Sequence, residues 1–277
     1  MEPGQEQRKT YIWGKALTGT EEHALQATTA VEIRALTELS EFDLCVEIET
    51  AVWGYDPADM IPRRMFLLAS RIGGQVMGAI AGGTMAGFAM ALPGYRHGHP
   101  YLHSHMVGVL PEFRNLGLGR KLKLAQREDA LARGFELMEW TFDPLEIKNA
   151  HLNIARLGAI VRRYKRNFYG PSSSPLQGGL PTDRVYAEWW LRSKRVCSVL
   201  AGEQPKFEVL EQVNVPRQIY EWKASDTHRA EARRIQASNA SALEDAFARG
   251  HSVLGYQRNS EGDGNFLLGL WDEALNY

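Results

Sequence analysis

Hydrophobic and polar residues alternate along the 277-residue chain in short blocks, some with a helical period and others with the period of a strand. Apolar residues recur near helical spacing between Leu39 and Trp53. The uncharged run from Val76 to Leu92 is interrupted at Gly82-Gly83, which is typical of two strands joined by a tight turn. The whole pattern predicts strands at 31–36, 76–81, 84–92, 102–109, 136–142, 160–169 and 184–191, and helices at 39–53, 62–70, 120–133 and 149–157.

Two stretches between these elements are rich in turn-forming residues. We predict a polar loop over 93–100 and a Ser/Pro/Gly-rich loop over 171–181. Beyond residue 195 the pattern predicts a strand or two, a helix over 227–249 and a terminal pair of strands at 252–257 and 265–271. The predicted organisation is a polar N-terminal extension (1–29), a core (30–194) and a C-terminal strand–helix–hairpin extension (195–277) that packs on the core.

The segment Arg114-Asn115-Leu116-Gly117-Leu118-Gly119 lies between a predicted strand and a predicted helix. The start of a helix carries unpaired backbone N–H groups and the positive end of the helix dipole, both of which attract phosphate. Gly117 and Gly119 have no Cβ, so a pyrophosphate can approach the backbone there. The basic side chains expected near this opening are those of Arg114, Arg120, Lys121 and Lys123. The segment therefore predicts a site for a phosphorylated ligand.

This segment follows Val109-Leu110-Pro111-Glu112-Phe113 and precedes a strand and a helix that ends at Leu157-Gly158-Ala159. In that order it resembles the acyl-CoA pyrophosphate loop of the GNAT acyltransferase superfamily. Residues across roughly 30–195 are similar to a bacterial branch of predicted GNAT acyltransferases, mostly of unassigned substrate. The resemblance implies an α/β fold in which helices flank a central mixed β-sheet. It also implies acetyl-CoA, or another acyl-CoA such as succinyl-CoA, as co-substrate.

The resemblance also implies which residues contact the CoA. The backbone of Val107, Gly108 and Val109 lies where the family binds pantetheine and directs an N–H at the thioester oxygen. The turn from Arg114 to Arg120 would bind the pyrophosphate. Asn149 would contact pantetheine, and its alternative role is to cap the following helix through its side chain.

Acyl transfer to an amine needs a group that takes the proton of the nucleophile. His103 and His105 are two residues apart on a predicted strand, so both side chains point to one face. His105 is the first choice for the base because it is nearer to the expected thioester position, and His103 would then face the substrate. The alternative is that both are structural histidines. Asp143 is a further candidate for the base or for holding the substrate ammonium, and its alternative is a turn aspartate before Pro144.

The leaving thiolate could take a proton from a general acid. Many GNAT enzymes use a tyrosine four residues before the glycine of the Leu-Gly-Phe ending, and this chain has Ile154 there. Tyr164 or Tyr169 could replace it. A CoA thiolate could also leave without an acid, because the free thiol pKa is only about 8.5.

The dipeptide Asp183-Arg184 follows the predicted flexible loop and carries two opposite charges. These residues could clamp an amino acid, Asp183 on the ammonium and Arg184 on the carboxylate, or they could form an internal ion pair. The basic run of Arg162, Arg163, Lys165 and Arg166 is either a solvated surface or an anion site. In a regular strand Arg162, Tyr164 and Arg166 would share one side.

The amino-acid composition limits the classes of function that the protein can have. Basic residues number 32 and acidic residues 33, so the net charge of −1 argues against a general nucleic-acid binder. The two cysteines, Cys45 and Cys197, show no disulfide framework and no zinc spacing, so we expect no metal and a reducing cytoplasm. We also expect no secretory signal and no membrane segment, since glycines interrupt the longest uncharged run. A homodimer is compatible with the sequence.

These observations predict a CoA-dependent N-acyltransferase that moves an acetyl or succinyl group directly to a small amine in a ternary complex. An O-acyltransferase or a user of longer acyl donors is an alternative among enzymes. The alternative of a different class is a non-catalytic CoA-binding regulatory or interaction module, which the isoleucine at position 154 keeps open.

Overall fold

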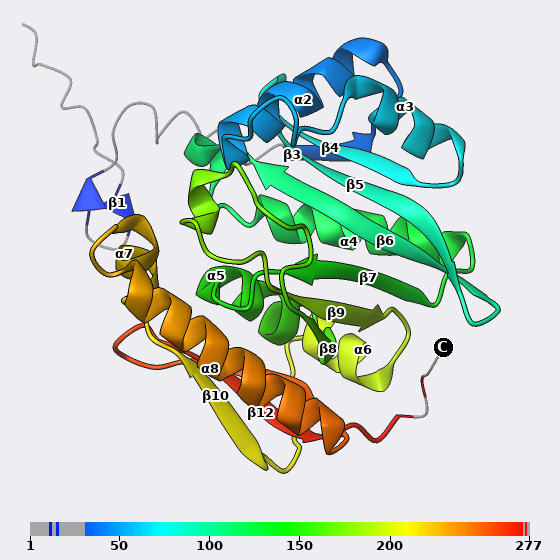
Figure 1. Cartoon of the computed structure of the whole chain (residues 1–277). Helices are drawn as coiled ribbons and strands as arrows, with labels where there is room; N and C mark the ends of the chain where they lie inside the picture. The colour runs from blue at the N-terminus through cyan, green and yellow to red at the C-terminus, as the bar shows by residue number, and fades with distance from the viewer. Residues whose placement is uncertain (1–10, 13–14, 17–30, 274, 276–277) are drawn as a thin grey trace, which may run out of the picture.

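The computed structural model describes residues 11–12, 15–16, 31–273 and 275. The predicted N-terminal extension, 1–29, lies outside the described residues except for β1 (Tyr11–Ile12) and β2 (Lys15–Ala16), which pair with each other. The rest of the described chain forms one sheet of ten strands flanked by helices, in the order β10-β12-β11-β8-β9-β7-β6-β5-β4-β3 (Figure 1). The predicted α/β class with a central mixed sheet is confirmed.

The N-terminal part of the core follows the predicted order closely. Its elements are β3 (Val31–Ala35), α2 (Leu39–Trp53), α3 (Arg63–Arg71), β4 (Gln75–Ala81), β5 (Thr84–Arg96) and β6 (His99–Val109). Helix α2 begins with a reciprocal capping box between Glu38 and Glu41 and ends at Gly54, whose φ of 61° is the left-handed conformation that favours glycine. These local signals explain why the helix has the predicted bounds.

The predicted polar loop over 93–100 is wrong. Strands β5 and β6 continue through it as a long antiparallel hairpin, with Arg96 opposite His99. The turn is confined to His97 and Gly98, which have φ angles of 49° and 87°. The glycine, proline and histidines of this stretch are typical of loops. Pairing between the two strands nevertheless continues from Pro93 opposite Leu102 to Arg96 opposite His99.

The second part of the core contains a short helical turn and the predicted helix after it. Its elements are a turn at Pro111–Phe113, α4 (Leu118–Ala132), β7 (Leu137–Phe142), α5 (Ile147–Ala150), the π-helical turn η3 (His151–Arg156), β8 (Ile160–Lys165), η4 (Pro175–Gln177) and β9 (Arg184–Trp190). The predicted helix over 149–157 is therefore α5 continued by a wider turn. Such π-helical insertions are often found at functional sites.

The C-terminal extension continues the sheet of the core. It consists of α6 (Lys194–Leu200), β10 (Glu211–Val215), α7 (Ile219–Ala224), α8 (Arg229–Ala248), β11 (His251–Arg258) and β12 (Gly264–Leu270). Strand β11 pairs with β8 of the core at Val253 and Val161. Helix α8 lies across β8, β10 and β11 (Figure 1). The extension and the core are thus parts of one sheet.

Two faces of the sheet carry different helices. On β4, Val76 packs in a cluster with residues of α2 and α3, whereas its neighbour Met77 packs in a cluster with Leu122 of α4. Because successive side chains of a strand point to opposite faces, we call these the α2 face and the α4 face. The largest cluster contains Trp189, whose ring nitrogen donates to the carbonyl of Leu157 at 2.7 Å. Residues of α4, α5, α7 and α8 contribute to it.

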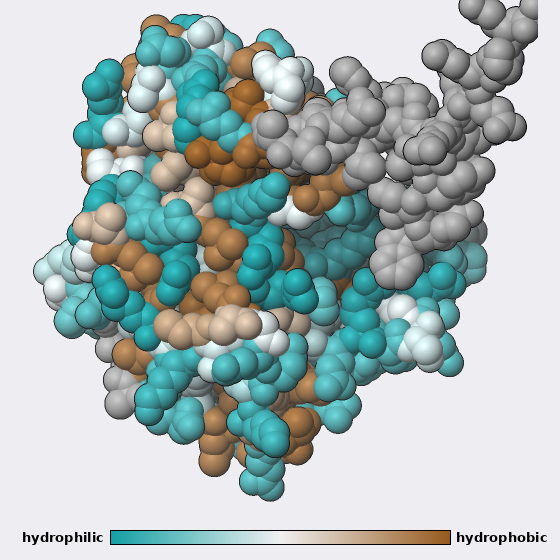
Figure 2. All heavy atoms as spheres, turned by 180° about the vertical axis from the view of Figure 1, so that it is seen from behind, coloured by the Kyte–Doolittle hydropathy of each residue, from teal (hydrophilic) through white to brown (hydrophobic). Residues whose placement is uncertain are grey.

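The described helices include none that is long and apolar enough to cross a membrane. The surface seen from behind is a mixture of hydrophilic and hydrophobic residues, with a hollow in the hydrophilic part on the right of the view (Figure 2).

Candidate active site

Strands β6 and β7 separate in the middle of the sheet. They pair in parallel only at Leu102 with Met138 and at His103 with Glu139, although β6 continues to Val109 and β7 to Phe142. Beyond His103 the facing edges of the two strands do not form a ladder. Backbone groups on such an edge need a partner, and an extended polar ligand can supply one.

A β-bulge lies at the point where the strands separate. On β6, Ser104 pairs with Ala91 and Met106 pairs with Met90, so His105 is the additional residue. The side chain of Ser104 contacts α4, whereas Met106 packs in the cluster of α2. The bulge therefore changes which face the strand presents, and bulges of this kind are common next to active sites.

The glycine-bearing turn lies at the other end of the separation, between β6 and α4. Asn115 and Gly117 have φ angles of 63° and 77°. Within the described chain, the backbone N–H groups of residues 115–120 have no hydrogen-bond partner. A Cβ built on Gly117 would meet nothing within 4 Å. Open space beside consecutive free N–H groups fits a pyrophosphate.

The basic residues near this turn do not all take the expected positions. Arg114 is exposed and donates to the carbonyl of Val109 at 3.3 Å, and Arg120 donates to the carbonyl of Arg156 at 3.5 Å. Lys121 is exposed, whereas Lys123 is buried. The expectation that Lys123 adds charge at the opening is therefore wrong, because its position on α4 faces the sheet.

Lys123 instead occupies the point where the strands separate, on the α4 face. Its Nζ donates to the hydroxyl of Ser104 at 2.7 Å and lies 3.5 Å from the ring centre of Trp140 on β7. Ser104 in turn donates to Gln126 at 2.8 Å. Burial lowers the pKa of Lys123 well below its ordinary value.

The two histidines lie together on the α2 face. Leu102 packs in the main cluster with α4, so the next residue, His103, points the other way. The rings of His103 and His105 are 6.3 Å apart. Burial, together with the neighbouring His103, lowers the pKa of His105 to about 4. His105 is therefore neutral at pH 7, while Nδ1 of His103 lies 3.8 Å from the carboxylate of Glu139.

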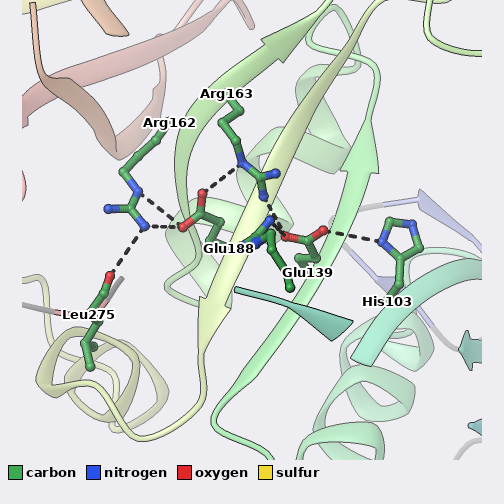
Figure 3. A network of polar contacts seen from close by, with 7 residues as sticks. His103, Glu139, Arg162, Arg163, Glu188 and Leu275 are labelled. Atoms are coloured by element: carbon green, nitrogen blue, oxygen red, sulfur yellow. Dashed lines mark hydrogen bonds and ion pairs between the residues drawn. The ribbon is translucent and has the colours of Figure 1, made fainter. Parts of the chain in front are cut away.

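A network of charges continues from His103 across the same face (Figure 3). Glu139 and Glu188 are opposite each other on β7 and β9, and each is only 2% exposed. The arginines that bind these carboxylates are Arg96, Arg162 and Arg163. Burial raises the pKa of Glu139, but His103, Arg163 and Arg96 outweigh it and lower the value to about 2. Three arginines and two carboxylates leave the network cationic.

Sequence reasoning missed this network. The signal was a glutamate in the middle of two otherwise apolar strands, at Glu139 and Glu188. The expectation that Arg162, Tyr164 and Arg166 share one side is also wrong. The register between β8 and β9 shifts between Val161 and Tyr164, so Arg162 and Arg163 both reach Glu188.

Two loops meet over the α2 face near the strand separation. Ser173 accepts from the N–H of Asp56 at 3.0 Å and donates its hydroxyl to Asp59 at 2.6 Å. Ser174 donates to the carbonyl of Trp53 at 2.6 Å. The ring of Trp53 would be 3.1 Å from a Cβ at Gly108 on β6. The predicted loop over 171–181 is therefore joined to the end of α2, above the separating strands.

Residues 41–153 match the profile of the acetyltransferase (GNAT) family. They form a GNAT acetyltransferase domain. The domain runs from α2 to η3 and includes the separating strands and the glycine-bearing turn. The co-substrate of the family is acetyl-CoA, as the sequence predicted. No curated protein sequence matches the chain.

Solved structures of acetyltransferases align with most of the core. The ribosomal-protein-S18-alanine N-acetyltransferase of Escherichia coli is 18% identical, with a TM-score of 0.48, over 64% of this chain and 100% of that one. The ribosomal-protein-alanine N-acetyltransferase of Brucella melitensis is 18% identical, with a TM-score of 0.46, over 57% and 98%. A GNAT family acetyltransferase of Elizabethkingia anophelis with acetyl-CoA bound is 13% identical, with a TM-score of 0.42, over 58% and 97%.

Several other predicted site residues have structural partners in or beside the GNAT domain. Asp143 accepts from Nζ of Lys223 at 3.0 Å and from the N–H of Leu145 at 2.8 Å. Lys223 also donates to Glu146 at 2.8 Å and belongs to α7 of the extension. Asp143 is buried in this ion pair, which joins the extension to the end of β7.

Tyr164 and Asp183 form a pair on the α4 face. The hydroxyl of Tyr164 donates to Asp183 at 2.6 Å, and the N–H of Asn167 donates to the same carboxylate at 2.8 Å. Burial, and then this hydrogen bond, raises the pKa of Tyr164 far above its ordinary value. Tyr164 packs against the main cluster, so it lies on the opposite face from His103 and His105.

The structure does not bring the carboxylate of Asp183 to the guanidinium of Arg184. Arg184 donates to the backbone carbonyl of Asp183 at 2.7 Å and lies 5.3 Å from the ring centre of Tyr169. Asn149 is exposed inside α5, and its side-chain oxygen accepts from Asn153 at 3.1 Å. The capping alternative for Asn149 is wrong because the helix begins earlier, at Ile147.

Among the described residues, no three His, Cys, Asp or Glu side chains gather closely enough to hold a metal ion.

Ile154, at the position of the usual acid, is fully buried in the main cluster. Tyr169, one of the two tyrosines considered as a replacement acid, is 47% exposed. Its hydroxyl lies 3.1 Å from the hydroxyl of Thr141 on β7.

Proposed function

We propose that the protein is an N-acyltransferase that moves an acetyl or succinyl group from acyl-CoA to the amine of a small molecule, an amino acid in particular. The observation that carries the proposal is the separation of β6 from β7 next to a turn with free backbone N–H groups. Acyl-CoA supplies the activated thioester carbonyl that the amine attacks, with loss of the CoA thiolate.

The donor side of the site is made of backbone. The unpaired edge of β6 at Val107, Gly108 and Val109 suits the amides of pantetheine, which are themselves backbone-like. Residues 115–119 suit the pyrophosphate, and Arg114 and Arg120 are exposed or half-exposed beside them. An N–H near the bulge at His105 would stabilise the oxyanion that develops during transfer.

The acceptor side of the site is the α2 face. His105 is neutral at neutral pH, so it can accept a proton, but a pKa of about 4 makes it a weak base. It suits a strongly acidic donor, such as the protonated nitrogen of the tetrahedral intermediate. The ring of His103 is 6.3 Å from that of His105, and Nδ1 of His103 lies 3.8 Å from the carboxylate of Glu139.

The charges on this face favour a substrate that carries a carboxylate. The arginines of the network outnumber its buried glutamates. Arg184 of β9 donates to Gln177 at 3.4 Å, and Gln177 belongs to the same loop as Ser174, which donates to Trp53. A planar guanidinium binds a carboxylate through two parallel hydrogen bonds. The carboxylates of Asp143 and Asp183 already bind Lys223 and Tyr164, respectively. In this proposal they do not hold the substrate ammonium, and the amine reacts in its neutral form.

In this proposal the thiolate either leaves without an acid or takes a proton from Tyr169. Tyr164 points to the other face, and Ile154 cannot donate a proton. Tyr169 is the remaining candidate acid, because its hydroxyl is close to the end of β7. Both cysteines are free thiols, which suits a cytoplasmic enzyme.

The test is a substrate screen with the full chain. Acetyl-CoA and succinyl-CoA are each mixed with amino acids, and separately with polyamines, and the release of free thiol is measured. We expect thiol release that depends on an amino acid. Tight CoA binding by calorimetry, without thiol release for any amine, would instead favour a non-catalytic CoA-binding module.

A further inference from the structure

A cationic cavity of about 310 Å³ lies between the GNAT domain and the C-terminal extension. Its basic residues are Lys148 at the start of α5, Arg217 before α7, and Arg258 at the end of β11. Tyr220 of α7 and Ile147 of α5 also line it. Most of the lining therefore comes from the extension rather than from the GNAT domain.

The three cations of this cavity are not compensated within the described part of the chain. None of Lys148, Arg217 and Arg258 forms a side-chain ion pair there, although Glu221 is among the lining residues. Arg162 and Arg166 are paired with carboxylates, and Arg127 and Arg195 donate to backbone carbonyls. Unpaired cations that converge on one cavity favour an anionic ligand.

The cavity is close to the turn that suits the pyrophosphate. A Cβ on Gly119 would lie 3.9 Å from the side chain of Leu152. Lys148 precedes Leu152 by four residues, so it lies on the same side of the α5–η3 segment, about one helical turn of roughly 5.4 Å nearer its start. Arg120, next to Gly119, also contacts the carbonyl of Arg156 on this segment. The cavity and the turn therefore both adjoin the α5–η3 segment.

Tyr220 adds a surface for a base. Tyr220 lines the cavity together with Ile147 and Lys148 at the start of α5. The side chain is 36% exposed, so part of the ring remains available beside the cations. Aromatic rings of this kind stack on nucleobases.

We propose that this cavity binds the 3′-phosphate of acyl-CoA, with Lys148, Arg217 and Arg258 around the phosphate and Tyr220 beside the adenine. The proposal rests on the proposed function, because it assumes that acyl-CoA is the donor. It assigns a role to the C-terminal extension: the extension distinguishes CoA from its 3′-dephospho form, whereas the GNAT domain binds the pyrophosphate and pantetheine.

The test measures two ligands by calorimetry on the full chain: CoA and 3′-dephospho-CoA. We expect the wild type to bind CoA about tenfold more tightly, since exposed cations each contribute modestly. In the double variant Arg217→Gln/Arg258→Gln this ratio should fall to near one, with the affinity for dephospho-CoA unchanged. Arg71→Gln, an exposed arginine on α3, is the matched control and should keep the wild-type ratio.

Four outcomes would overturn the proposal. Equal affinity of the wild type for both ligands would show that the 3′-phosphate has no site. An equal loss of both affinities in the double variant would show that the arginines act on the fold or on another part of CoA. Binding of inorganic phosphate that depends on the two arginines, with an unchanged CoA ratio, would assign the cavity to a separate phosphate ligand. Binding of neither CoA form by the wild type would contradict the proposed function as well.

Discussion

The side-chain nitrogen of Lys123 lies 3.5 Å from the ring centre of Trp140, at the level where β6 and β7 stop pairing. Lys123 comes from α4 and Trp140 from β7, and Ser104 of β6 accepts the hydrogen bond from the same nitrogen. One polar side chain of helix α4 thus contacts both strands at the level where their pairing ends.

Replacement of Lys123 by Met tests how this buried amine responds to pH. Burial lowers the pKa of Lys123 in the folded state below the 10.5 of the unfolded state, so the unfolded chain binds more protons between the two values. Wild-type stability should therefore rise with pH from neutrality toward about 10.5 and fall as the pH is lowered. Lys123→Met removes this contribution, and urea denaturation at pH 7 and pH 9.5 measures it.

Lys121→Met is the matched control, because Lys121 is exposed on the same helix. It should leave the pH dependence of the free energy of unfolding unchanged. Identical pH profiles for the wild type and Lys123→Met would contradict the lowered pKa of Lys123.

The glycine turn predicts the effect of Gly117→Asp on CoA binding. The new carboxylate would lie beside the free N–H groups of residues 115–120 and repel the pyrophosphate. Gly134→Asp is a matched control at the other end of α4, with a φ of 82° against 77° and the same open space. We expect calorimetry to show loss of CoA binding only for Gly117→Asp. Equal CoA affinity in the two folded variants would remove the pyrophosphate from this turn.

The bulged histidine predicts a catalytic defect with a specific pH profile. His105→Gln keeps hydrogen bonding but cannot take a proton, so the rate should fall about 100-fold. With a pKa of about 4, His105 loses its proton-accepting form only in acid, so the wild-type rate should decline near pH 4 and the variant should lack that decline. His97→Asn, in the exposed turn between β5 and β6, serves as control. A variant with the wild-type rate and profile would make His105 structural.

The position of Arg184 predicts a change in substrate affinity. Arg184→Lys keeps the charge but loses the planar pair of donors, so KM for an amino acid should rise about tenfold or more. KM for acyl-CoA should not change. The control substrate is the amine that corresponds to the amino acid without its carboxylate. The KM for this amine should be the same in the wild type and in Arg184→Lys. A rise in KM for acyl-CoA instead would assign Arg184 to the donor side.

Glu49 predicts a stability effect of the opposite sign to that of Lys123. It is fully buried on α2, one oxygen accepts from the N–H of Ile61 at 2.9 Å, and burial raises its pKa to about 7. The unfolded value is 4.5, so wild-type stability should fall as the pH rises from about 4.5 to about 7. Glu49→Gln should match the wild type near pH 5 and exceed it by about 1–2 kcal/mol at pH 8.

Thermal unfolding of the two proteins between pH 5 and pH 8 measures this difference. Glu47→Gln is the control, since Glu47 is exposed on the same helix. If Glu49→Gln were less stable than the wild type at every pH, the carboxylate would have a charged partner in the folded state.

Local signals were sufficient for most elements of the core. Helix α2 has the predicted bounds because its apolar period, its capping box and Gly54 all lie within a few residues of each other. The turn at Gly117 was predictable because a glycine between a strand and a helix indicates a tight turn, and Gly117 has the left-handed φ of 77° that favours glycine. The loop predicted over 93–100 failed because its turn signal occupies only His97 and Gly98, and the strands on either side depend on each other.

The candidate site was only partly predictable. His103 and His105 were placed on one face, and the structure keeps them together. The bulges at His105 and between Val161 and Tyr164 were not predicted, because an additional residue shifts the alternation by one position and these strands are short. The pairing of Glu139 with Glu188 depends on which strands become neighbours, and β7 and β9 are far apart in the sequence.

By itself the sequence determined the order of strands and helices, the glycine-bearing turn between β6 and α4, and the membership of residues 41–153 in an acetyltransferase family, because each depends on residues close together in the chain. Only the tertiary structure decided that Lys123 is buried against Ser104 and Trp140 and that Asp143 is paired with Lys223 of the extension. Only it brought the extension onto the sheet of the core. These outcomes depend on packing between distant segments, where burial and partner choice set the state of each charge.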